Sequence, residues 1–324
     1  MFKILIICLL LSQGLLSSLE SEKVKNDNIS VPTEAHTLEV QSRISYEING
    51  HNLGDNLMSY LRGKWLSFHY NIPLLYKPFP FANQFNLHGE EKKKFKPILL
   101  TKFEAVHSIS NELDLCFEDP SNILYVIPTF TESEIEFDDD VPFLEIDWQA
   151  KDFRKLLKKL IKPAKSITGL AIPRQRISIA VYMPAPTEKE GEEVKQTSPL
   201  KYPPDSYYIE QINKLDDLFY HRPLYVYLFT ENRNPAEVIK KFTKSISKHN
   251  ILFECKTSHK MTRSSSVEDF FNMGEFNCLI RPMNNLGFLL EQMNNYLITV
   301  KPVHHKMVNN NVYIDNTFMK FQEK

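Results

Sequence analysis

Short apolar runs and helix-spaced apolar stripes alternate along the second half of the chain. The runs RISIAVYMP (176–184), PLYVYLFT (223–230), NILFECKT (250–257), FNCLIRP (276–282) and LITVKP (297–302) are typical of buried strands. Between them, apolar residues recur at helical spacing after Asp205, after Asn234-Pro235 and around the capping-box pair Ser265 and Glu268. Strands that alternate with helices predict a parallel, doubly wound sheet with right-handed crossovers.

The first half carries a shorter version of the same pattern. RISYEI (43–48) alternates like a strand, the stretch from Asp55 to Tyr70 has helical spacing, and IPLLY (72–76) and NILYVIP (122–128) are again strand-like. The segment therefore predicts a βαβ unit. A helix whose stripe includes Phe153 and Leu157 is ended by Pro163, and we place the domain boundary at this proline.

Glycine is concentrated in one place. The chain has nine glycines in 324 residues, and Gly50, Gly54 and Gly63 fall within the stretch INGHNLGDNLMSYLRGKW (48–65). Glycine lets a turn be tight and lets the backbone approach a neighbour closely. The pattern predicts a tight turn between strand and helix, which serves either a ligand or the packing of the chain alone.

The N-terminal segment has the pattern of a secretory signal. Residues 1–21 hold an early lysine, an apolar run of about ten residues and then small polar residues, which is too short for a membrane-spanning helix. We expect a cleaved signal peptide (1–21), a flexible lead-in (22–40), an N-terminal Rossmann-like domain (41–165), a C-terminal one (166–302) and a C-terminal tail (303–324). The protein is then exported, and it meets a membrane only if the segment is kept as an anchor.

Composition and charge exclude some classes of function. The formal net charge is −1, whereas a nucleic-acid binder usually carries a strongly basic domain. Three cysteines follow the signal segment, Cys116, Cys255 and Cys278, so at most one disulfide bond forms. The last two fall in strand-like runs, where we expect small buried apolar side chains.

The chemistry is expected where strands end, because ligands of doubly wound sheets bind beyond the carboxyl ends of the strands. Thr230 and Glu231, Arg263 and Ser265, Arg281, and the pair Asn284-Asn285 all follow strand-like runs. Arginine binds phosphate in a two-pronged geometry, and free amides of a helix starting near Ser265 would add to it, although both arginines could equally be surface residues. His304-His305 and the acidic run 136–142 lack the spacing of a metal site, so no metal or resident cofactor is expected.

Several of these segments together resemble fucosyltransferase-like glycosyltransferases. GHNLGDNLMSYLRGKWLSFHYNIPLL resembles the G-x-L-G-N/D-x-L opening of that family, and LYVYLFTEN stands where the family has a strand ending in Ser/Thr-Asp-Asp. SVEDFFNMGEFNCLIRPMNNLGFLLEQM resembles its D-x-x-x-M segment and the helix that follows. The resemblance spans about residues 43–302 and implies a GT-B-like α/β fold, in which two Rossmann-like domains with doubly wound parallel sheets face each other across a cleft.

The resemblance also implies a metal-free transfer of a sugar, usually fucose, from a nucleotide donor such as GDP-fucose to a glycan or glycoprotein acceptor. It places Asp269 as a buttress of the donor loop. The donor side would then comprise Tyr182, Thr230, Glu231, Arg263, Ser265, Asp269, Arg281, Asn284 and Asn285. The turn on the acceptor side would comprise Gly50, His51, Asn52, Gly54, Asp55 and Asn56.

One departure from the family bears on activity. The family strand continues into His-x-Arg, whose arginine holds the donor diphosphate, but here Ala180 replaces the histidine and MPAP (183–186) brings no arginine. Losing such an electrostatic contact costs roughly 3 to 4 kcal/mol of transition-state stabilisation. Two hypotheses follow: a glycosyltransferase with a degenerate donor site, or an inactive relative that binds a glycan or protein after export. Nucleotide sugars are scarce outside the cytoplasm, and this favours the second unless the N-terminal segment is kept as an anchor.

Overall fold

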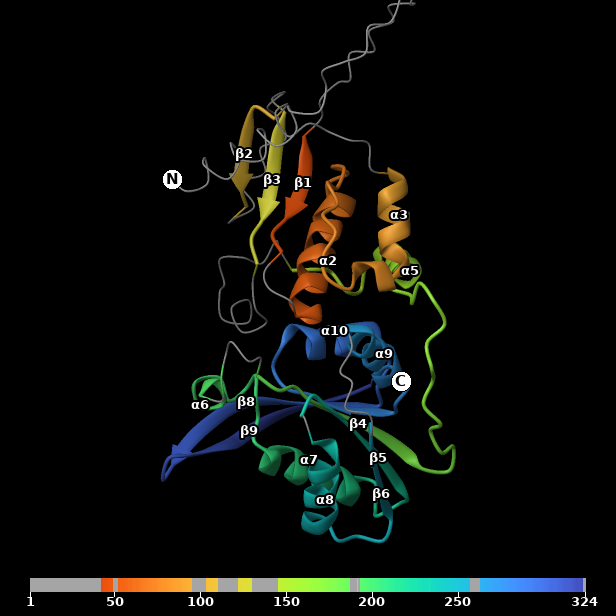
Figure 1. The fold of residues 1–324 in the computed structure, drawn as a ribbon, viewed down its shortest axis with the longest axis vertical. Helices are drawn as coiled ribbons and strands as arrows, with labels where there is room; N and C mark the ends of the chain where they lie inside the picture. The colour runs from red at the N-terminus through yellow and green to blue at the C-terminus, as the bar shows by residue number, and fades with distance from the viewer. Residues whose placement is uncertain are drawn as a thin grey trace, which may run out of the picture. The chain divides into compact units, whose positions relative to one another are not determined.

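The structure is a computed structural model that describes residues 42–48, 52–94, 103–109, 122–129, 145–186, 191, 193–232, 234–256 and 263–322, with the backbone alone for 263–265. The expected signal peptide and lead-in, Gly50, His51 and Cys116 lie outside the described residues. Residues from Val40 onward form one compact unit. Within it the chain builds two separate sheets (Figure 1), so the predicted α/β class is confirmed.

The first sheet is small and parallel. It consists of β1 (Arg43–Tyr46), β3 (Ile123–Ile127) and β2 (Ala105–Ser108), in that spatial order. The expected strand 72–76 contributes a single parallel bridge between Leu74 and Ile44. Pro73 has no N–H to donate, which shortens the ladder. The crossover still follows the predicted βαβ order, because α2 (Leu53–His69) connects β1 to this bridge.

Three helical elements accompany this sheet and α2. They are η1 (Ala82–Gln84), α3 (Asn86–Lys94) and α5 (Lys151–Leu160), the last ending shortly before Pro163 as predicted. Glu91 on α3 lies buried against α2: its carboxylate accepts a hydrogen bond from the Tyr60 hydroxyl at 3.0 Å and pairs with the Lys64 ammonium at 2.7 Å. A buried ion pair therefore ties α3 to α2.

The second sheet has six strands in the order β6-β5-β4-β7-β8-β9. The strands are β4 (Ile177–Met183), β5 (Leu224–Thr230), β6 (Ile251–Cys255), β7 (Cys278–Ile280), β8 (Ile298–Val308) and β9 (Asn311–Phe321). All neighbours are parallel except β8 and β9, which form an antiparallel hairpin. The expectation of a C-terminal tail at 303–324 is therefore wrong. Burial along β8 is confined to its first half, at Ile298, Thr299, Val300 and Pro302, and the more exposed residues after Pro302 show no apolar alternation from which a strand could be predicted.

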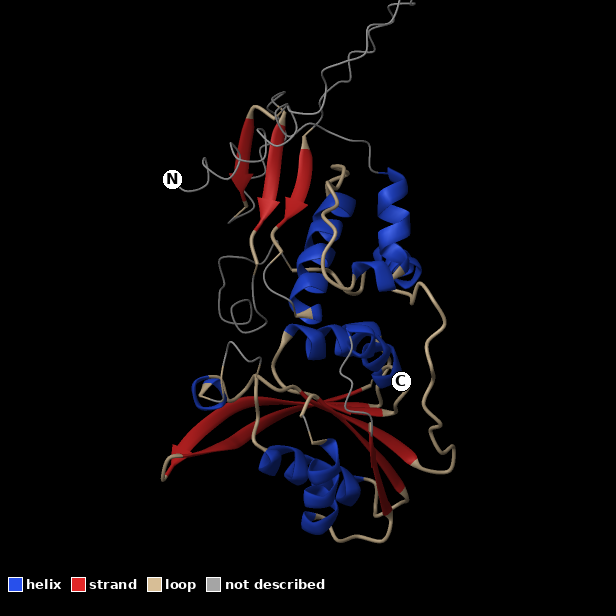
Figure 2. Cartoon of the chain, viewed as in Figure 1, coloured by secondary structure: helices blue, strands red, loops and turns tan. Residues whose placement is uncertain are grey.

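Helices cover both faces of the second sheet (Figure 2). Helices α7 (Asp205–Leu218) and α8 (Pro235–Ser245) lie on one face, and α9 (Arg263–Met273) and α10 (Asn285–Met293) on the other. A short α6 (Val194–Thr197) precedes α7. Asp205 is the first residue of α7, and α9 begins two residues before Ser265, near which its start was predicted. Strand β4 lies between β5 and β7, which makes its carboxyl end the point where the strand order reverses.

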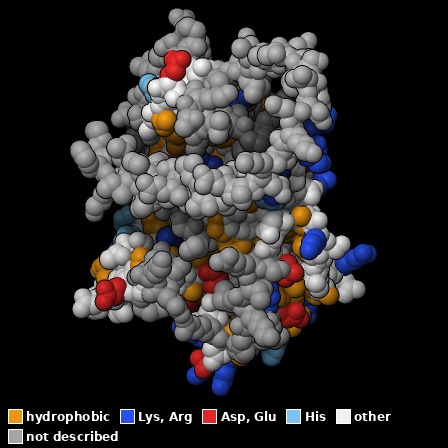
Figure 3. Space-filling model, turned by 45° about the horizontal axis from the view of Figure 1, so that its top comes forward, with side chains coloured by type: hydrophobic (Ala, Val, Ile, Leu, Met, Phe, Trp, Pro, Cys, Tyr) orange, Lys and Arg blue, Asp and Glu red, His pale blue; other side chains and the backbone are white. Residues whose placement is uncertain are grey.

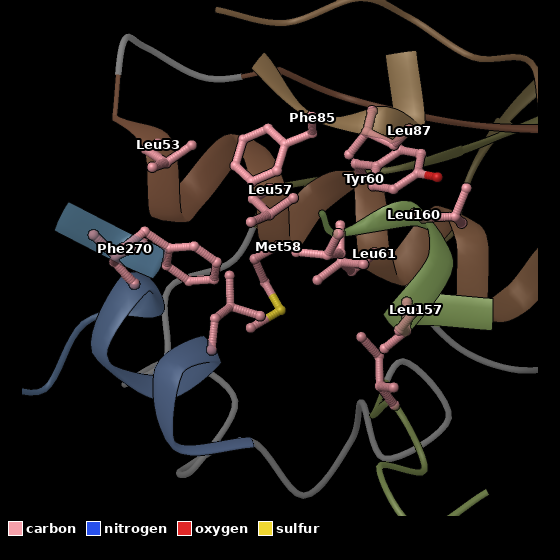
Figure 4. Close-up of a cluster of buried hydrophobic side chains, with 14 of the residues drawn as sticks. Leu53, Leu57, Met58, Tyr60, Leu61, Phe85, Leu87, Leu157, Leu160 and Phe270 are labelled. Atoms are coloured by element: carbon pink, nitrogen blue, oxygen red, sulfur yellow. The ribbon is translucent and has the colours of Figure 1, made fainter. Parts of the chain in front are cut away.

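Two apolar clusters form the core. One fills the space between the six-stranded sheet and α7 and α8. The other joins residues of α2, β1 and β3 to residues of α9 and α10 without a break. Figure 4 shows part of this second cluster, where Leu53, Leu57 and Met58 of α2 lie near Phe270 of α9.

The structure explains why position 54, in the glycine-rich stretch 48–65, is a glycine. A Cβ atom at this position would lie 2.5 Å from the backbone nitrogen of Leu286, the second residue of α10. The first turns of α2 and α10 therefore touch through a glycine, and packing is the reason for it. Gly63 is similar, because a Cβ atom there would meet the Tyr46 ring at 2.9 Å.

Cys278 is buried and Cys255 half-buried, and both are free thiols. Burial raises the pKa of the Cys278 thiol to about 12, which suits the expected apolar role. Across the part of the chain that is described, no helix is long and apolar enough to cross a membrane.

Candidate functional site

Polar side chains converge where β4, β5 and β7 end. Tyr182 is the second-last residue of β4, Glu231 follows β5 directly, and Asn284 follows β7 and caps α10. Tyr182 is buried, its side chain is hydrogen-bonded to that of Asn284, and Glu231 lies near it. Burial, helped by the Glu231 charge, raises the pKa of the Tyr182 hydroxyl well above its ordinary value, so it stays protonated. These three predicted donor-side residues are brought together.

Glu231 organises the two loops that leave β4 and β5. Its carboxylate accepts a hydrogen bond from the Ala185 N–H at 3.2 Å, and its own N–H donates to the Met183 carbonyl at 3.2 Å. Thr230 turns the same loop, since its hydroxyl accepts from the Asn232 N–H at 3.1 Å. The loop geometry leaves Glu231 half-buried at the carboxyl edge of the sheet.

The acceptor-side turn reaches the same edge. Asn52 caps α2, its side chain accepting from the Gly54 N–H at 2.8 Å. Asp55 in the first turn of α2 accepts a hydrogen bond at 2.8 Å from the side-chain amide of Asn285, the first residue of α10. Asn56 is buried beside them. We call Tyr182, Glu231, Asn284, Asn285 and Asp55 the carboxyl-edge cluster.

Two helix N-termini meet in this cluster, and each carries a partial positive charge from its free N–H groups. Asn284 accepts from the Gly287 N–H at 2.8 Å and so caps α10 as Asn52 caps α2. Asp55 places a negative charge in the first turn of α2 and bonds to the first residue of α10. A carboxylate of the protein thus offsets the positive ends of both helices.

Arg281 takes a structural place, which corrects the expectation that it holds a phosphate. Its side chain is 1 % exposed and pairs with Glu291 through two nitrogens, at 2.9 and 2.7 Å. The Tyr207 hydroxyl donates to the Arg281 carbonyl at 3.1 Å. The residue follows β7 by one position, and its side chain enters the core below α10 rather than the strand-end edge.

The remaining predicted donor residues lie on or near α9. Asp269 pairs with Lys256, which follows β6, at 3.1 Å. Burial raises the pKa of the Asp269 carboxyl, and Lys256 opposes that rise only in part. The contact ties α9 to the end of β6. Arg263 and Ser265 belong to the first turn of α9, and their side chains lie outside the described residues.

The strand position that departs from the family is buried. Ala180 is 0 % exposed, and its side chain packs within the core that joins α2 to α9 and α10. On the face drawn in Figure 3, acidic and basic side chains of the described residues are interspersed. Sequence reasoning missed that Asp55 has a partner in α10, and it missed Tyr202, a buried residue near Tyr182.

A cavity of about 640 Å³ lies beside the cluster, at the ends of β4 and β5. Met183, Ala185 and Thr230 line it from the sheet, and the first turn of α7 and the tip of the β8–β9 hairpin complete it. A second cavity of about 750 Å³ lies under residues 163–176 at the opposite, amino end of β4. Neither cavity is lined by residues of the first sheet.

Two other groups of titratable residues have partners within the protein. Asp216, Asp217 and His221 lie close enough to hold an ion, but the Lys248 ammonium contacts Asp216 at 2.8 Å and supplies the positive charge. His304 pairs with Asp315 across the hairpin at 2.6 Å. These contacts explain both groups as structural pairs.

Comparison with known proteins identifies structures of similar fold. No protein-family model matches the chain, and no curated protein matches it in sequence. Among solved structures, POFUT1 in complex with GDP-fucose is 8 % identical with a TM-score of 0.46, over 81 % of this chain and 96 % of that one. The fucosyltransferase NodZ from Bradyrhizobium is 12 % identical with a TM-score of 0.47, over 87 % and 100 % of the two chains.

Arabidopsis thaliana FUT1 in complex with GDP is 11 % identical with a TM-score of 0.48, over 84 % of this chain and 73 % of that one. At this level the likeness concerns the fold and not the residues of the site.

Proposed function

We propose that this chain binds a glycan through a fucosyltransferase-like fold, and that its degenerate donor site does not support sugar transfer from a GDP-fucose type donor. The observation that carries the proposal is the carboxyl-edge cluster. Its charged members among the described residues, Asp55 and Glu231, are both acids, while Asn284, Asn285 and Tyr182 are neutral. Carboxylates accept hydrogen bonds from sugar hydroxyls, and amides both donate and accept.

The same cluster disfavours a diphosphate. Two carboxylates at the strand ends repel a nucleoside diphosphate, and Asp55 already offsets the positive ends of α2 and α10. The sequence brings no arginine into the segment 183–186, and Arg281 is engaged by Glu291. A donor that leaves as a diphosphate needs such a cation to stabilise the developing charge.

The second candidate function is transfer itself, with an altered donor site. The carboxylates of Asp55 and Glu231 favour it, because a carboxylate near an acceptor hydroxyl can act as a general base. The first turn of α9, which follows β6 at the same edge, would offer N–H groups to a phosphate. This candidate requires the donor to bind despite the two acids.

Binding of nucleotide and of glycan separates the two candidates. We expect no shift of the thermal unfolding temperature with GDP or GDP-fucose, and specific binding of the chain to a glycan array. A donor present at about 100 times its dissociation constant would stabilise an active enzyme by about 2.7 kcal/mol. Stabilisation by GDP-fucose together with transfer of labelled fucose to an acceptor glycan would overturn the proposal in favour of the enzyme.

Variants of the cluster test where the glycan binds. Asp55→Asn and Glu231→Gln keep the shape of each side chain and remove its charge, and we expect each to weaken glycan binding about tenfold, as for one charged hydrogen bond. Glu237→Gln on α8, exposed and outside the cluster, is the matched control and should leave binding unchanged.

Export through the segment 1–21 is also part of the proposal. N-terminal sequencing of protein recovered from the medium of expressing eukaryotic cells tests it, since cleavage after about residue 21 yields a new N-terminus. An intact Met1 on membrane-bound protein would favour the anchored enzyme instead.

A further inference from the structure

We propose that the 640 Å³ cavity between α7, the end of β5 and the tip of the β8–β9 hairpin binds a neutral sugar and forms a second glycan subsite next to the carboxyl-edge cluster. The inference rests on the proposed function and adds a location to it. Pockets for small ligands commonly have volumes of about 300 to 1,000 Å³, so the size suits one or two sugar rings. The carboxyl ends of β4 and β5 form its floor, where ligands of such sheets bind.

The walls of the cavity are held by local geometry. Pro203 and Pro204 line it directly before α7, and their rings fix the backbone on that side. On the other side, Asn309 and Asn310 turn the hairpin with positive φ angles of 51° and 60°. Positive φ at both central residues is the type I′ arrangement, which asparagine tolerates. The turn therefore presents Asn311 and Tyr313 to the cavity without a flexible loop.

The lining matches the two faces of a sugar ring. Tyr313 contributes exposed aromatic surface, against which the apolar C–H face of a pyranose packs, and the buried Tyr202 and Tyr208 lie in the wall behind. Gln196, Asn232 and Asn311 contribute amides, which donate to and accept from hydroxyl groups. Tyr208 is buried at the wall and its hydroxyl has no hydrogen-bond partner among the described residues, so a polar ligand that reached this wall would supply one.

The charges around the cavity favour a neutral ligand over an anion. Lys241 is paired with Asp205 at 2.6 Å, and Asp205 stands in the first turn of α7, where it offsets the positive end of that helix. Among the described residues that line the cavity, Lys195 is the one other charged residue. A phosphate would meet the Asp205 carboxylate, whereas a sugar hydroxyl would not be repelled.

The cavity adjoins the carboxyl-edge cluster through one residue. Ala185 lines the cavity, and its N–H donates to the Glu231 carboxylate of the cluster. A glycan of several sugars can therefore place one ring at the cluster and another in the cavity.

The test compares two aromatic residues of the same strand. Tyr313 lines the cavity and is 44 % exposed, while Phe318 is 50 % exposed and does not line it. Binding of N-acetylglucosamine, fucose and lactose to the full chain is measured by saturation-transfer NMR and titration. We expect at least one of these sugars to bind, Tyr313→Ala to weaken its binding tenfold or more, and Phe318→Ala to change it less than twofold.

A second variant guards against an indirect effect on the hairpin. Asn232 lies on the loop after β5 and not on the hairpin. We expect Asn232→Ala to weaken sugar binding as Tyr313→Ala does, and we expect both variants to unfold at the wild-type temperature. If Glu231→Gln abolished sugar binding while Tyr313→Ala and Asn232→Ala left it intact, the cavity would not be a subsite. The proposed function at the carboxyl-edge cluster would still stand. Binding of none of the sugars would overturn both, and competition of a bound sugar by inorganic phosphate at equal concentration would show an anion site instead.

Discussion

The side-chain amide of Asn285 donates a hydrogen bond to the carboxylate of Asp55 at 2.8 Å, across 230 positions of sequence. Asp55 belongs to the first helix after β1, and Asn285 begins the helix after β7. Their contact joins the turn that the sequence assigns to an acceptor side with a residue that it assigns to a donor side. It also puts a negative charge where α2 and α10 begin, and this charge offsets the partial positive charge of both helix ends.

The close approach of α2 and α10 predicts that Gly54→Ala destabilises the protein. The added methyl group would lie 2.5 Å from the Leu286 nitrogen and 2.8 Å from its Cβ atom. Overpacking of this kind costs about 1 to 3 kcal/mol, measured as the free energy of unfolding in urea. Gly89→Ala is the matched control: it lies in α3 with nothing within 4 Å of an added Cβ atom. It should stabilise the helix by about 0.5 to 1 kcal/mol, and equal effects of the two variants would contradict the packing argument.

The Arg281–Glu291 pair predicts a large loss of stability when one partner is removed. Arg281→Met removes the two-pronged partner of the buried Glu291 carboxylate and leaves it with the exposed Lys320 ammonium at 3.4 Å. We expect a loss of about 3 kcal/mol in the free energy of unfolding, the lower end for a broken buried pair. The double variant Arg281→Met with Glu291→Leu should recover much of that loss, because no buried charge remains unpaired. A single variant as stable as the wild type would restore Arg281 as a candidate phosphate ligand.

The same pair predicts a dependence of stability on pH. Burial alone would raise the pKa of the Glu291 carboxyl, but the Arg281 guanidinium outweighs it and holds that pKa below its ordinary value. The contribution to stability is therefore present above the pKa of the unfolded chain, near 4.5. It is lost as the pH falls through the lower folded value. Unfolding curves between pH 3 and 6 should show a smaller acid loss for the double variant than for the wild type.

Replacement of the two neighbouring glutamates of α3, Glu90 and Glu91, should change the free energy of unfolding by very different amounts. Glu91→Ala leaves the Lys64 ammonium buried without its partner, and we expect a loss of about 3 to 5 kcal/mol in unfolding free energy. Glu90→Ala removes ion pairs with Lys93 and Lys159, both of which are exposed. Surface pairs contribute little, so this control should stay close to the wild type in chemical denaturation. A larger effect at Glu90 than at Glu91 would refute the assignment.

The hairpin turn predicts a strict preference at Asn309. Its φ angle of 51° suits asparagine or glycine, and a β-branched residue there is strained. Asn309→Val should therefore cost about 1 to 2 kcal/mol of stability, while Asn309→Gly should be nearly neutral. Both variants are compared by thermal unfolding, and sugar binding should fall with the valine variant alone if the turn positions the cavity wall.

Much of the fold could be predicted from the alternation of apolar runs. Strands β4 to β7 and helices α7, α8 and α9 lie within a few residues of the ranges expected, because each buries a regular stripe of side chains. The hairpin formed by β8 and β9 could not be predicted, since most of its residues beyond Pro302 are exposed and show no apolar period. The run 72–76 was predicted as a full strand, but it forms a single bridge, because Pro73 has no N–H to donate to the sheet.

The candidate site could be predicted only in part. The rule that ligands bind beyond strand ends selected Glu231 and Asn284, and the structure brings both close to Tyr182, which only the family resemblance had placed on the donor side. It failed for Arg281, whose position after β7 says nothing about the direction of its side chain. For Arg263 the rule stays a prediction, because its side chain falls outside the described residues.

The amino-acid sequence by itself determined the α/β class, the order of most elements and the lack of an arginine after the first strand of the second sheet. These are local properties, which depend on periodicity and on residue type alone. Only the tertiary structure decided that Asp55 meets Asn285, that Gly54 serves a helix contact and that Arg281 is buried with Glu291. Such pairings depend on how distant helices pack, since a side chain finds its partner through the fold and not through its neighbours in the chain.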